Sequence, residues 1–275
     1  MATGKINTID AFIPLHPKDL DMLPYCVIGL RKNVKELRNI YVVSKENPED
    51  IDDIIWVPES SFPFSIENVG AHIKSTNNRE GWYFQQLLKM YAFRVIDTCA
   101  DNLLLFDADC VICRPISFFD ENNRALMDWT DEQIHLPYFE HASKVLKDAF
   151  VRVDSTKSGV TDHMLVRRDI MEEILQKIEH SGNAWQILLE AVDPSQWDKS
   201  GMSEYEIYYN YALKWFSDEY SLRKLTREIG LTFGALSRNS QHLDIIAFHA
   251  WALDLRRKTE TSAPNNGGVA SDETG

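Results

Sequence analysis

Two acidic residues stand directly after a strongly apolar stretch of the chain: Asp107 and Asp109, separated by Ala108. The stretch itself, residues 102–106, reads Asn-Leu-Leu-Leu-Phe and is typical of a short strand buried on both faces. Since successive side chains of a strand point to opposite faces, the two carboxylates would lie on the same side. Such a pair at the carboxyl end of a central strand suits a hard divalent cation, Mn²⁺ or Mg²⁺, that carries a phosphorylated ligand.

The same spacing of acidic residues occurs twice more in the chain, so the spacing alone does not indicate a metal site. Asp19-Leu20-Asp21 is expected at a helix start, and Asp50-Ile51-Asp52 in a solvated turn. Neither pair ends a buried strand. The apolar lead-in therefore distinguishes Asp107 and Asp109 from a chance occurrence.

Residues 79–95 form the clearest helix pattern, with two contrasting faces. One face is apolar and is expected to join the core. The opposite face carries Trp82, Gln85, Gln86 and Lys89, a composition unusual for a freely hydrated surface. We interpret it as the polar wall of a cleft, with Lys89 directed at phosphate oxygens. The alternative is a surface helix with an incidental tryptophan.

The order of elements predicts an α/β fold with a sheet. Strand patterns cover about 9–14, 39–43 and 54–57, a turn at 158–162 leads into a strand, and a late strand covers 243–248. Helix patterns cover about 20–34, 168–180 and 203–215. Residues 121–154 give no clear assignment.

Composition excludes several classes of protein. The chain has 275 residues and a formal net charge of -13, which argues against non-specific binding of nucleic acid. No signal peptide or apolar run of membrane-spanning length is present. The four cysteines are expected to be reduced, because the Cys110–Cys113 spacing has no second pair to complete a zinc site and lacks a redox-motif context. Residues 258–275 are expected to be a disordered tail or a linker.

Taken together, the motifs resemble those of metal-dependent GT-A-type glycosyltransferases, in particular small bacterial and large-virus enzymes that build surface glycans. The pieces that carry the resemblance are, in chain order, Pro14-Leu15-His16-Pro17-Lys18-Asp19, Trp82 to Lys89, Leu105-Phe106-Asp107-Ala108-Asp109, Thr161-Asp162-His163-Met164, Ser203-Glu204-Tyr205-Glu206 and Phe248-His249-Ala250-Trp251.

The resemblance implies a three-layer α/β/α sandwich with a mixed, mainly parallel central sheet. It implies one catalytic domain over 1–257, with a nucleotide-binding half to about 115 and an acceptor-binding half to 257. The activity would be sugar transfer from a nucleotide-diphosphate sugar, with a UDP-sugar favoured over a GDP-sugar, to a glycan or lipid-linked acceptor. Such a protein would be cytoplasmic or peripheral at a membrane, and would serve synthesis of surface polysaccharide or glycoprotein glycans.

The resemblance also assigns roles to residues. Asp107, Asp109 and His249 would hold Mn²⁺ or Mg²⁺, with Trp251 covering the ion or simply packing. His163 would contact the acceptor. The residues expected to bind the nucleotide-sugar are His16, Asp19, Trp82, Gln85, Gln86, Lys89, Asp107 and Ala108.

An inverting transferase needs a carboxylate to accept the proton of the acceptor hydroxyl. Glu206 fits a capping box with Ser203, in which its side chain returns to the Ser203 N–H. Glu204, on the first turn, lacks such a role, although a negative charge there also suits a helix N-terminus. Glu204 is therefore the first candidate for the base, with Asp162 and Glu206 as alternatives.

Two other classes of function remain open from the sequence. A sugar nucleotidyltransferase would also use carboxylate-bound Mg²⁺, but the loop after the first strand lacks the glycines that usually cradle a triphosphate. A non-catalytic carbohydrate-binding module would bind glycan without nucleotide. A dinucleotide-dependent dehydrogenase is disfavoured, because no G-x-G-x-x-G follows the first strand.

Overall fold

The computed structural model describes residues 7–49, 51–132, 134–230 and 242–249. The predicted tail at 258–275 lies outside these residues, as do Asp50 and Trp251.

A five-stranded sheet lies at the centre, with strand order β3-β2-β1-β4-β7. Strands β1 to β4 run parallel to one another, whereas β7 runs antiparallel to β4. The central strands β1 and β4 are mostly apolar and almost fully buried, as expected for a sheet covered on both faces. The strands are β1 (Ile9–Pro14), β2 (Leu37–Ser44), β3 (Ile55–Pro58), β4 (Asn102–Phe106) and β7 (His163–Arg167).

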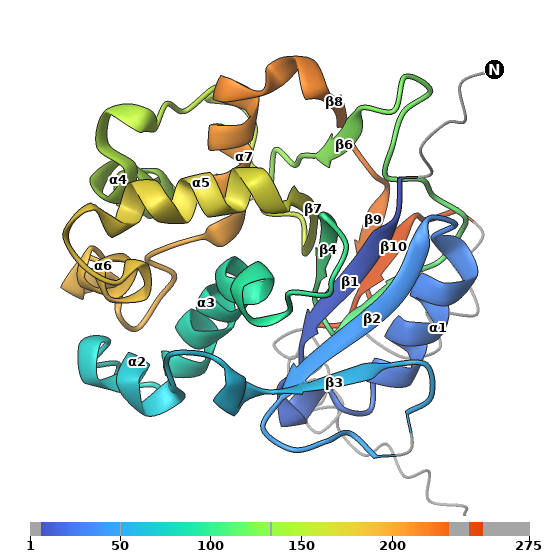
Figure 1. The fold of residues 1–275 in the computed structure, drawn as a ribbon, viewed down its shortest axis with the longest axis horizontal. Coiled ribbons are helices and arrows are strands. Elements are labelled where there is room, and N and C mark those ends of the chain that lie inside the picture. The colour runs from blue at the N-terminus through green and yellow to red at the C-terminus, as the bar shows by residue number, and fades with distance from the viewer. Residues whose placement is uncertain (1–6, 50, 133, 231–241, 250–275) are drawn as a thin grey trace, which may run out of the picture.

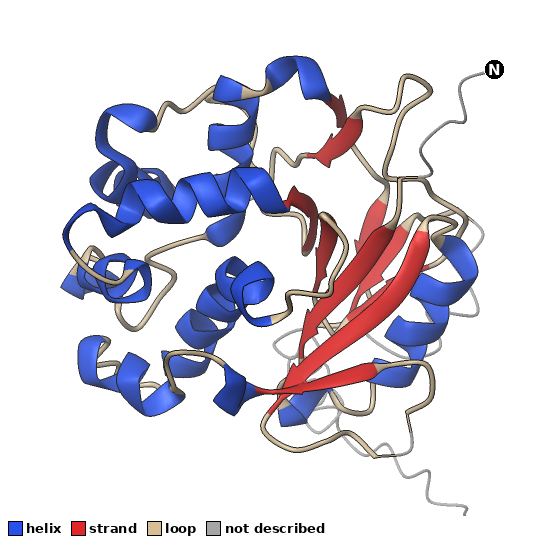
Figure 2. Cartoon of the chain, in the orientation of Figure 1, coloured by secondary structure: helices blue, strands red, loops and turns tan. Residues whose placement is uncertain are grey.

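Helices cover both faces of this sheet, which gives three layers (Figure 1). Helix α1 packs on one face, while α3 and α5 pack on the other against β1 and β7 (Figure 2). The helices are α1 (Leu23–Asn33), α2 (Ile66–His72), α3 (Glu80–Val95), α4 (Leu136–Leu146), α5 (Arg168–Ile178), α6 (Ala184–Glu190) and α7 (Glu204–Trp215). The predicted α/β architecture with a mixed, mainly parallel sheet is confirmed.

Two smaller sheets flank the centre. In one, β10 (Ile245–Ala247) pairs antiparallel with β5 (Cys110–Ile112) and parallel with β9 (Arg227–Ile229). In the other, β6 (Ala125–Asp128) pairs in parallel with β8 (Tyr220–Arg223). The first of these sheets brings the end of the described chain beside the residues that follow β4.

Several predicted boundaries need correction. Helix α1 begins at Leu23 instead of Leu20, because Pro17–Asp19 forms a 3-10 turn first and a proline is favoured at the first turn of the α-helix that follows. The unassigned stretch 121–154 contains β6, α4 and a further short 3-10 turn.

One buried carboxylate connects the strands at the amino-terminal end of the sheet. Asp10 on β1 is fully buried, and its carboxylate accepts hydrogen bonds from the Arg38 guanidinium at 2.6 and 3.0 Å. It also accepts from the backbone N–H groups of Asn39 and Ala100. These bonds connect β1 to β2 and to the loop before β4, so the buried carboxylate is satisfied.

No helix in the described part of the chain is long and apolar enough to cross a membrane. All four cysteines carry free thiols, and three of them are buried, as predicted.

Candidate functional site

The acidic pair lies where the chain order of the sheet reverses. From β1 the chain moves outward to β2 and β3, and it returns on the other side of β1 as β4. Ligands of open α/β sheets bind outside the carboxyl ends of the strands at such a reversal. Asp107 and Asp109 follow β4 directly, and Asp19 lies in the turn after β1.

Backbone hydrogen bonds draw two further segments to this point. The N–H of Asp107 donates to the carbonyl of Asp162, which precedes β7, at 3.1 Å. The N–H of Phe248, just after β10, donates to the carbonyl of Asp109 at 2.8 Å. Residues far apart in the sequence are thus gathered by the sheet.

Side chains of these segments form a connected polar cluster. His249 Nδ1 lies 3.2 Å from Asp109 Oδ2, and His249 Nε2 lies 3.8 Å from Asp162 Oδ1. Asp162 Oδ2 pairs with Arg227 Nη2 on β9 at 2.5 Å. Asp162 has a φ of 62°, so it occupies the left-handed region, where Asp is one of the few tolerated non-glycine residues. We call Asp19, Asp107, Asp109, Asp162 and His249 the carboxylate cluster.

Crowding of these groups shifts their proton affinities. Burial raises the pKa of Asp107 to about 6 against the attraction of Lys89, and the charges of Asp109 and Asp162 add to the rise. Burial also raises the pKa of Asp19 to about 6; Lys18 opposes this rise, whereas Asp109 and Asp107 strengthen it. The site therefore concentrates negative charge that a bound cation would relieve.

Asp109 and His249 shift in opposite senses. Burial acts to raise the pKa of Asp109, but the hydrogen bond and charge of His249, together with Cys110 and Lys18, hold the pKa below its usual value. Burial acts to lower the pKa of His249, yet the same bond and the nearby carboxylates raise it. Each partner thus favours the charged form of the other.

The structure corrects the predicted environment of Lys89. Lys89 is only 2% exposed, and it lies in the interior instead of on a cleft wall. Its Nζ is 2.7 Å from Asp107 Oδ1 and 2.9 Å from Glu204 Oε1, and it donates to the Tyr205 hydroxyl at 3.0 Å. Lys89 and Gln86 thus contact the start of α7, which supplies Glu204 as one of the anionic partners that a buried ammonium needs.

Glu204, the first candidate for the base, is likewise not a free side chain. It is 1% exposed, and its backbone N–H donates to Gln86 Oε1 at 3.1 Å. Glu204 is the first candidate because the sequence gives it no structural role. The structure shows that it has one, since its carboxylate pairs with Lys89.

Glu206 forms only half of the predicted capping box. Its N–H donates to Ser203 Oγ at 3.3 Å, but its own carboxylate accepts from Asn210 Nδ2 at 2.9 Å. Burial raises the pKa of Glu206 to about 7. Its side chain is a buried group beside the loop that carries Ser158 and Gly159, whereas Glu204 pairs with Lys89.

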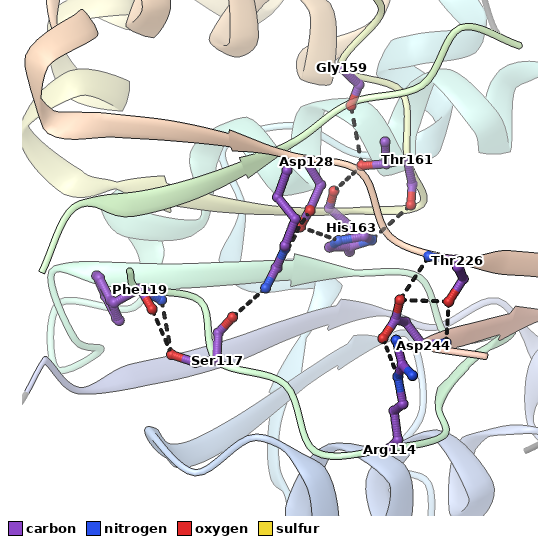
Figure 3. A network of polar contacts seen from close by, with 10 residues as sticks. Arg114, Ser117, Phe119, Asp128, Gly159, Thr161, His163, Thr226 and Asp244 are labelled. Carbon is purple, nitrogen blue, oxygen red and sulfur yellow. Dashed lines mark hydrogen bonds and ion pairs between the residues drawn. The ribbon is translucent and has the colours of Figure 1, made fainter. Parts of the chain in front are cut away.

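His163, the predicted acceptor contact, is buried with both ring nitrogens engaged. Nδ1 lies 2.8 Å from the Thr161 carbonyl, and Nε2 lies 2.9 Å from Asp128 Oδ2 (Figure 3). Asp128 in turn accepts two hydrogen bonds from Arg223. His163 therefore connects β7 to β6 through both ring nitrogens, and its contact with an acceptor stays a prediction.

The remaining predicted donor contacts lie apart from one another. Trp82 is half-buried, stacks on Tyr138 with ring centroids 6.4 Å apart, and has Arg79 above its ring. Gln85 is half-buried, whereas Gln86 is buried against Glu204. His16 is exposed beside the carboxylate cluster, and Ala108 is buried within it. Their role toward a nucleotide stays a prediction.

The donor set fits a hard divalent cation in its chemistry, since carboxylate oxygens and imidazole nitrogen suit Mn²⁺. Within the ranges that the structure describes, however, no three His, Cys, Asp or Glu side chains are grouped as ligands of one ion. The side chains pair with one another instead, so an ion would have to displace the contact between Asp109 and His249.

A cavity of about 450 Å³ adjoins the cluster on the side of Asp162. It is lined by Arg227, which pairs with Asp162 of the cluster, and by Thr161, which precedes Asp162. A larger hollow of about 950 Å³ lies at the opposite end of the sheet, around Asn102 and Arg167. The larger one is remote from the carboxylate cluster, and its arginines are paired with neighbouring carboxylates.

Sequence reasoning missed several residues of the site. Asp128 ends the short apolar run Ala125-Leu126-Met127, as Asp107 ends β4, and this pattern could have identified it. Arg227 and Tyr205 have no local signal, because only the tertiary fold brings them to Asp162 and Lys89.

Comparisons with known proteins give one sequence family and a distant likeness in structure. No curated protein matches the chain. The crystal structure of mouse xyloside xylosyltransferase 1 in its apo form is similar with a TM-score of 0.45 and 9% sequence identity, over 89% of this chain and 98% of that one. The model of the family described as "Family of unknown function (DUF6492)" matches residues 8–227, which contain every described part of the cluster except His249, and the chain belongs to this family.

Proposed function

We propose that the protein is a glycosyltransferase that moves a sugar from a nucleotide-diphosphate sugar, with a UDP-sugar favoured, to a glycan or lipid-linked acceptor. The single observation that carries the proposal is the carboxylate cluster at the reversal of the strand order, joined by His249 from the end of β10. Its residues lie where α/β proteins bind nucleotides, and they require a cation before they tolerate a diphosphate.

Asp107, Asp109 and His249 are the residues that would hold Mn²⁺ or Mg²⁺. When bound, the ion would neutralise the charge that develops on the diphosphate leaving group. The protein's part is to keep the ligands in place. Lys89 holds one oxygen of Asp107 at 2.7 Å, and His249 lies 3.2 Å from Asp109.

For an inverting reaction, Asp162 is now the preferred base. It belongs to the cluster and lies in the chain between Thr161 and His163, which line the adjoining cavity, whereas Glu204 is fully buried against Lys89. A base must come within hydrogen-bond distance of the acceptor hydroxyl or one water away. Asp162 is also paired with Arg227, which lines that cavity.

A thermal-unfolding screen tests the proposal. The chain is heated with UDP-sugars, GDP-sugars and nucleoside triphosphates, each with and without Mn²⁺. A specific ligand present at about 100 times its dissociation constant stabilises by about 2.7 kcal/mol, or roughly 5–10 °C for a protein of this size. We expect this shift for a nucleotide sugar with Mn²⁺ only. A preference for a triphosphate would favour a nucleotidyltransferase, and no response to any nucleotide would contradict both.

A further inference from the structure

The cavity beside Asp162 has walls from four separate segments. They are the end of β6 with the following loop, the turn before β7, the stretch from β8 to β9, and β10. Its floor is fixed by two polar networks that Figure 3 shows close together, one around His163 and one around Asp244. Thr226 donates to Asp244 from both its N–H and its hydroxyl at 2.7 Å, and Arg114 pairs with the same carboxylate. The cavity is thus held open by rigid, hydrogen-bonded walls.

Three charges in the cavity wall are balanced before any ligand enters, and the exposed Glu132 also lies in this wall. Lys224 pairs with Asp131 at 2.7 Å, and Arg227 pairs with Asp162 at 2.5 Å. Asp128 is matched by Arg223 at 2.7 Å. A wall with paired charges offers little to a phosphate or another strong anion, and it suits a neutral polar molecule.

Trp129 gives the cavity an apolar surface among these polar groups. Its indole is half-buried, and the ammonium groups of Lys157 and Lys224 lie 5.0 and 5.1 Å from the ring centroid, which restricts its position. Arg227 Nη1 is buried and makes no hydrogen bond within the described residues. An apolar ring beside an unused donor matches a molecule that carries both C–H faces and hydroxyl groups.

We propose that this space, the Trp129 cavity, binds a neutral saccharide and is the acceptor side of the transferase. The assignment of the cavity to the acceptor rests on the proposed function, whereas saccharide binding does not depend on it. The cavity volume of about 450 Å³ lies in the range of small-molecule sites, roughly 300–1,000 Å³. The Trp129 cavity adjoins the cluster through Thr161 and His163, which flank Asp162 in the chain, and through Arg227, which pairs with Asp162.

The test uses the full chain and two blocking variants. Trp129→Ala removes the apolar surface, and Leu225→Trp fills the space with a larger side chain. Trp215→Ala is the matched control, since Trp215 is a partly exposed tryptophan on α7 that does not line the cavity. The probes are an array of immobilised mono- and disaccharides, with the retained sugar then titrated by calorimetry, and UDP with Mn²⁺ titrated separately. Thermal unfolding verifies that each variant is folded.

We expect both blocking variants to bind the retained saccharide at least about 10-fold more weakly, with Trp215→Ala and the UDP affinity changed by less than about twofold. Saccharide binding that survives in both folded variants would overturn the inference, and so would a wild-type chain that retains no sugar. Loss of UDP binding in Trp129→Ala would assign the cavity to the donor and would also overturn it. If saccharide binding responds as expected while the wild type ignores UDP with Mn²⁺, the cavity assignment stands and the transferase proposal fails.

Discussion

Lys89 connects two carboxylates from different elements, and its removal should be costly. The Lys89→Met variant would leave Asp107 and Glu204 buried without their cation. Breaking a buried ion pair by removing one partner typically destabilises a protein by about 3–5 kcal/mol. We expect a loss of this size in urea unfolding.

A double variant distinguishes this ion-pair role from simple loss of packing. Lys89→Met combined with Glu204→Gln removes one of the two stranded charges, so it should recover part of the lost stability. If Lys89→Met alone lowers the free energy of unfolding by less than about 1 kcal/mol, this interpretation is contradicted. The Lys89 ammonium would then not be held by Asp107 and Glu204 as its distances of 2.7 and 2.9 Å from their carboxylate oxygens indicate.

Glu206 makes stability depend on pH in a defined direction. Burial raises the pKa of Glu206 from 4.5 to about 7, so the folded chain binds a proton more tightly than the unfolded chain does. The contribution of Glu206 to stability is complete below about pH 4.5 and is lost as the pH rises through 7. A shift of this size corresponds to roughly 3 kcal/mol.

The Glu206→Gln variant cannot titrate at this position. Its free energy of unfolding relative to the wild type should therefore rise by up to roughly 3 kcal/mol between pH 4.5 and pH 8. Urea unfolding over this range measures the difference, with the exposed Glu140→Gln as control. A difference that is constant with pH would show that the carboxyl group is not buried as described.

At the scale of elements, the contact between α7 and the loop before β7 positions Asp162. A Cβ added at Gly159 would lie 2.6 Å from Tyr209 Cβ and 2.8 Å from its Cγ, so the loop or the helix would have to move. We expect Gly159→Ala to destabilise the protein by about 1–3 kcal/mol. In contrast, a Cβ at Gly81 meets nothing within 4 Å, and Gly81→Ala on α3 should stabilise by about 0.5–1 kcal/mol. Urea unfolding of both variants tests the comparison, and equal effects would contradict it.

The elements that sequence predicts well are those whose pattern is decided locally. Strands β1 and β4 are nearly continuous apolar runs, and α3 shows helical spacing over its full length, so their positions agree closely with the prediction. Elements such as β5 and β9 are three residues long and exist through pairing with β10. No periodicity develops over three residues, and therefore β5 and β9 could not be predicted, whereas β10 lies within the predicted late strand at 243–248.

For the whole molecule, the position of the site could be predicted but its internal pairing could not. An apolar strand followed by Asp107 and Asp109 places the pair at the edge of the sheet, as observed. The partners of each charge depend on tertiary contacts. Lys89 and Glu204 are 115 residues apart by number and meet at 2.9 Å, and His163 looks available in sequence although its ring is enclosed by Asp128 and Thr161.

The central claim is that the carboxylate cluster binds a nucleotide diphosphate through a divalent cation. Calorimetric titration of UDP with and without Mn²⁺ measures this directly in the wild type and in Asp109→Asn. The control is Asp21→Asn, because Asp21 is exposed and belongs to the Asp-x-Asp pair that follows β1. We predict binding in the wild type only with Mn²⁺, a loss of at least about 100-fold in Asp109→Asn, and a change of less than about twofold in Asp21→Asn. Equal affinity in the wild type and in folded Asp109→Asn, or UDP binding that is independent of Mn²⁺, would contradict the account.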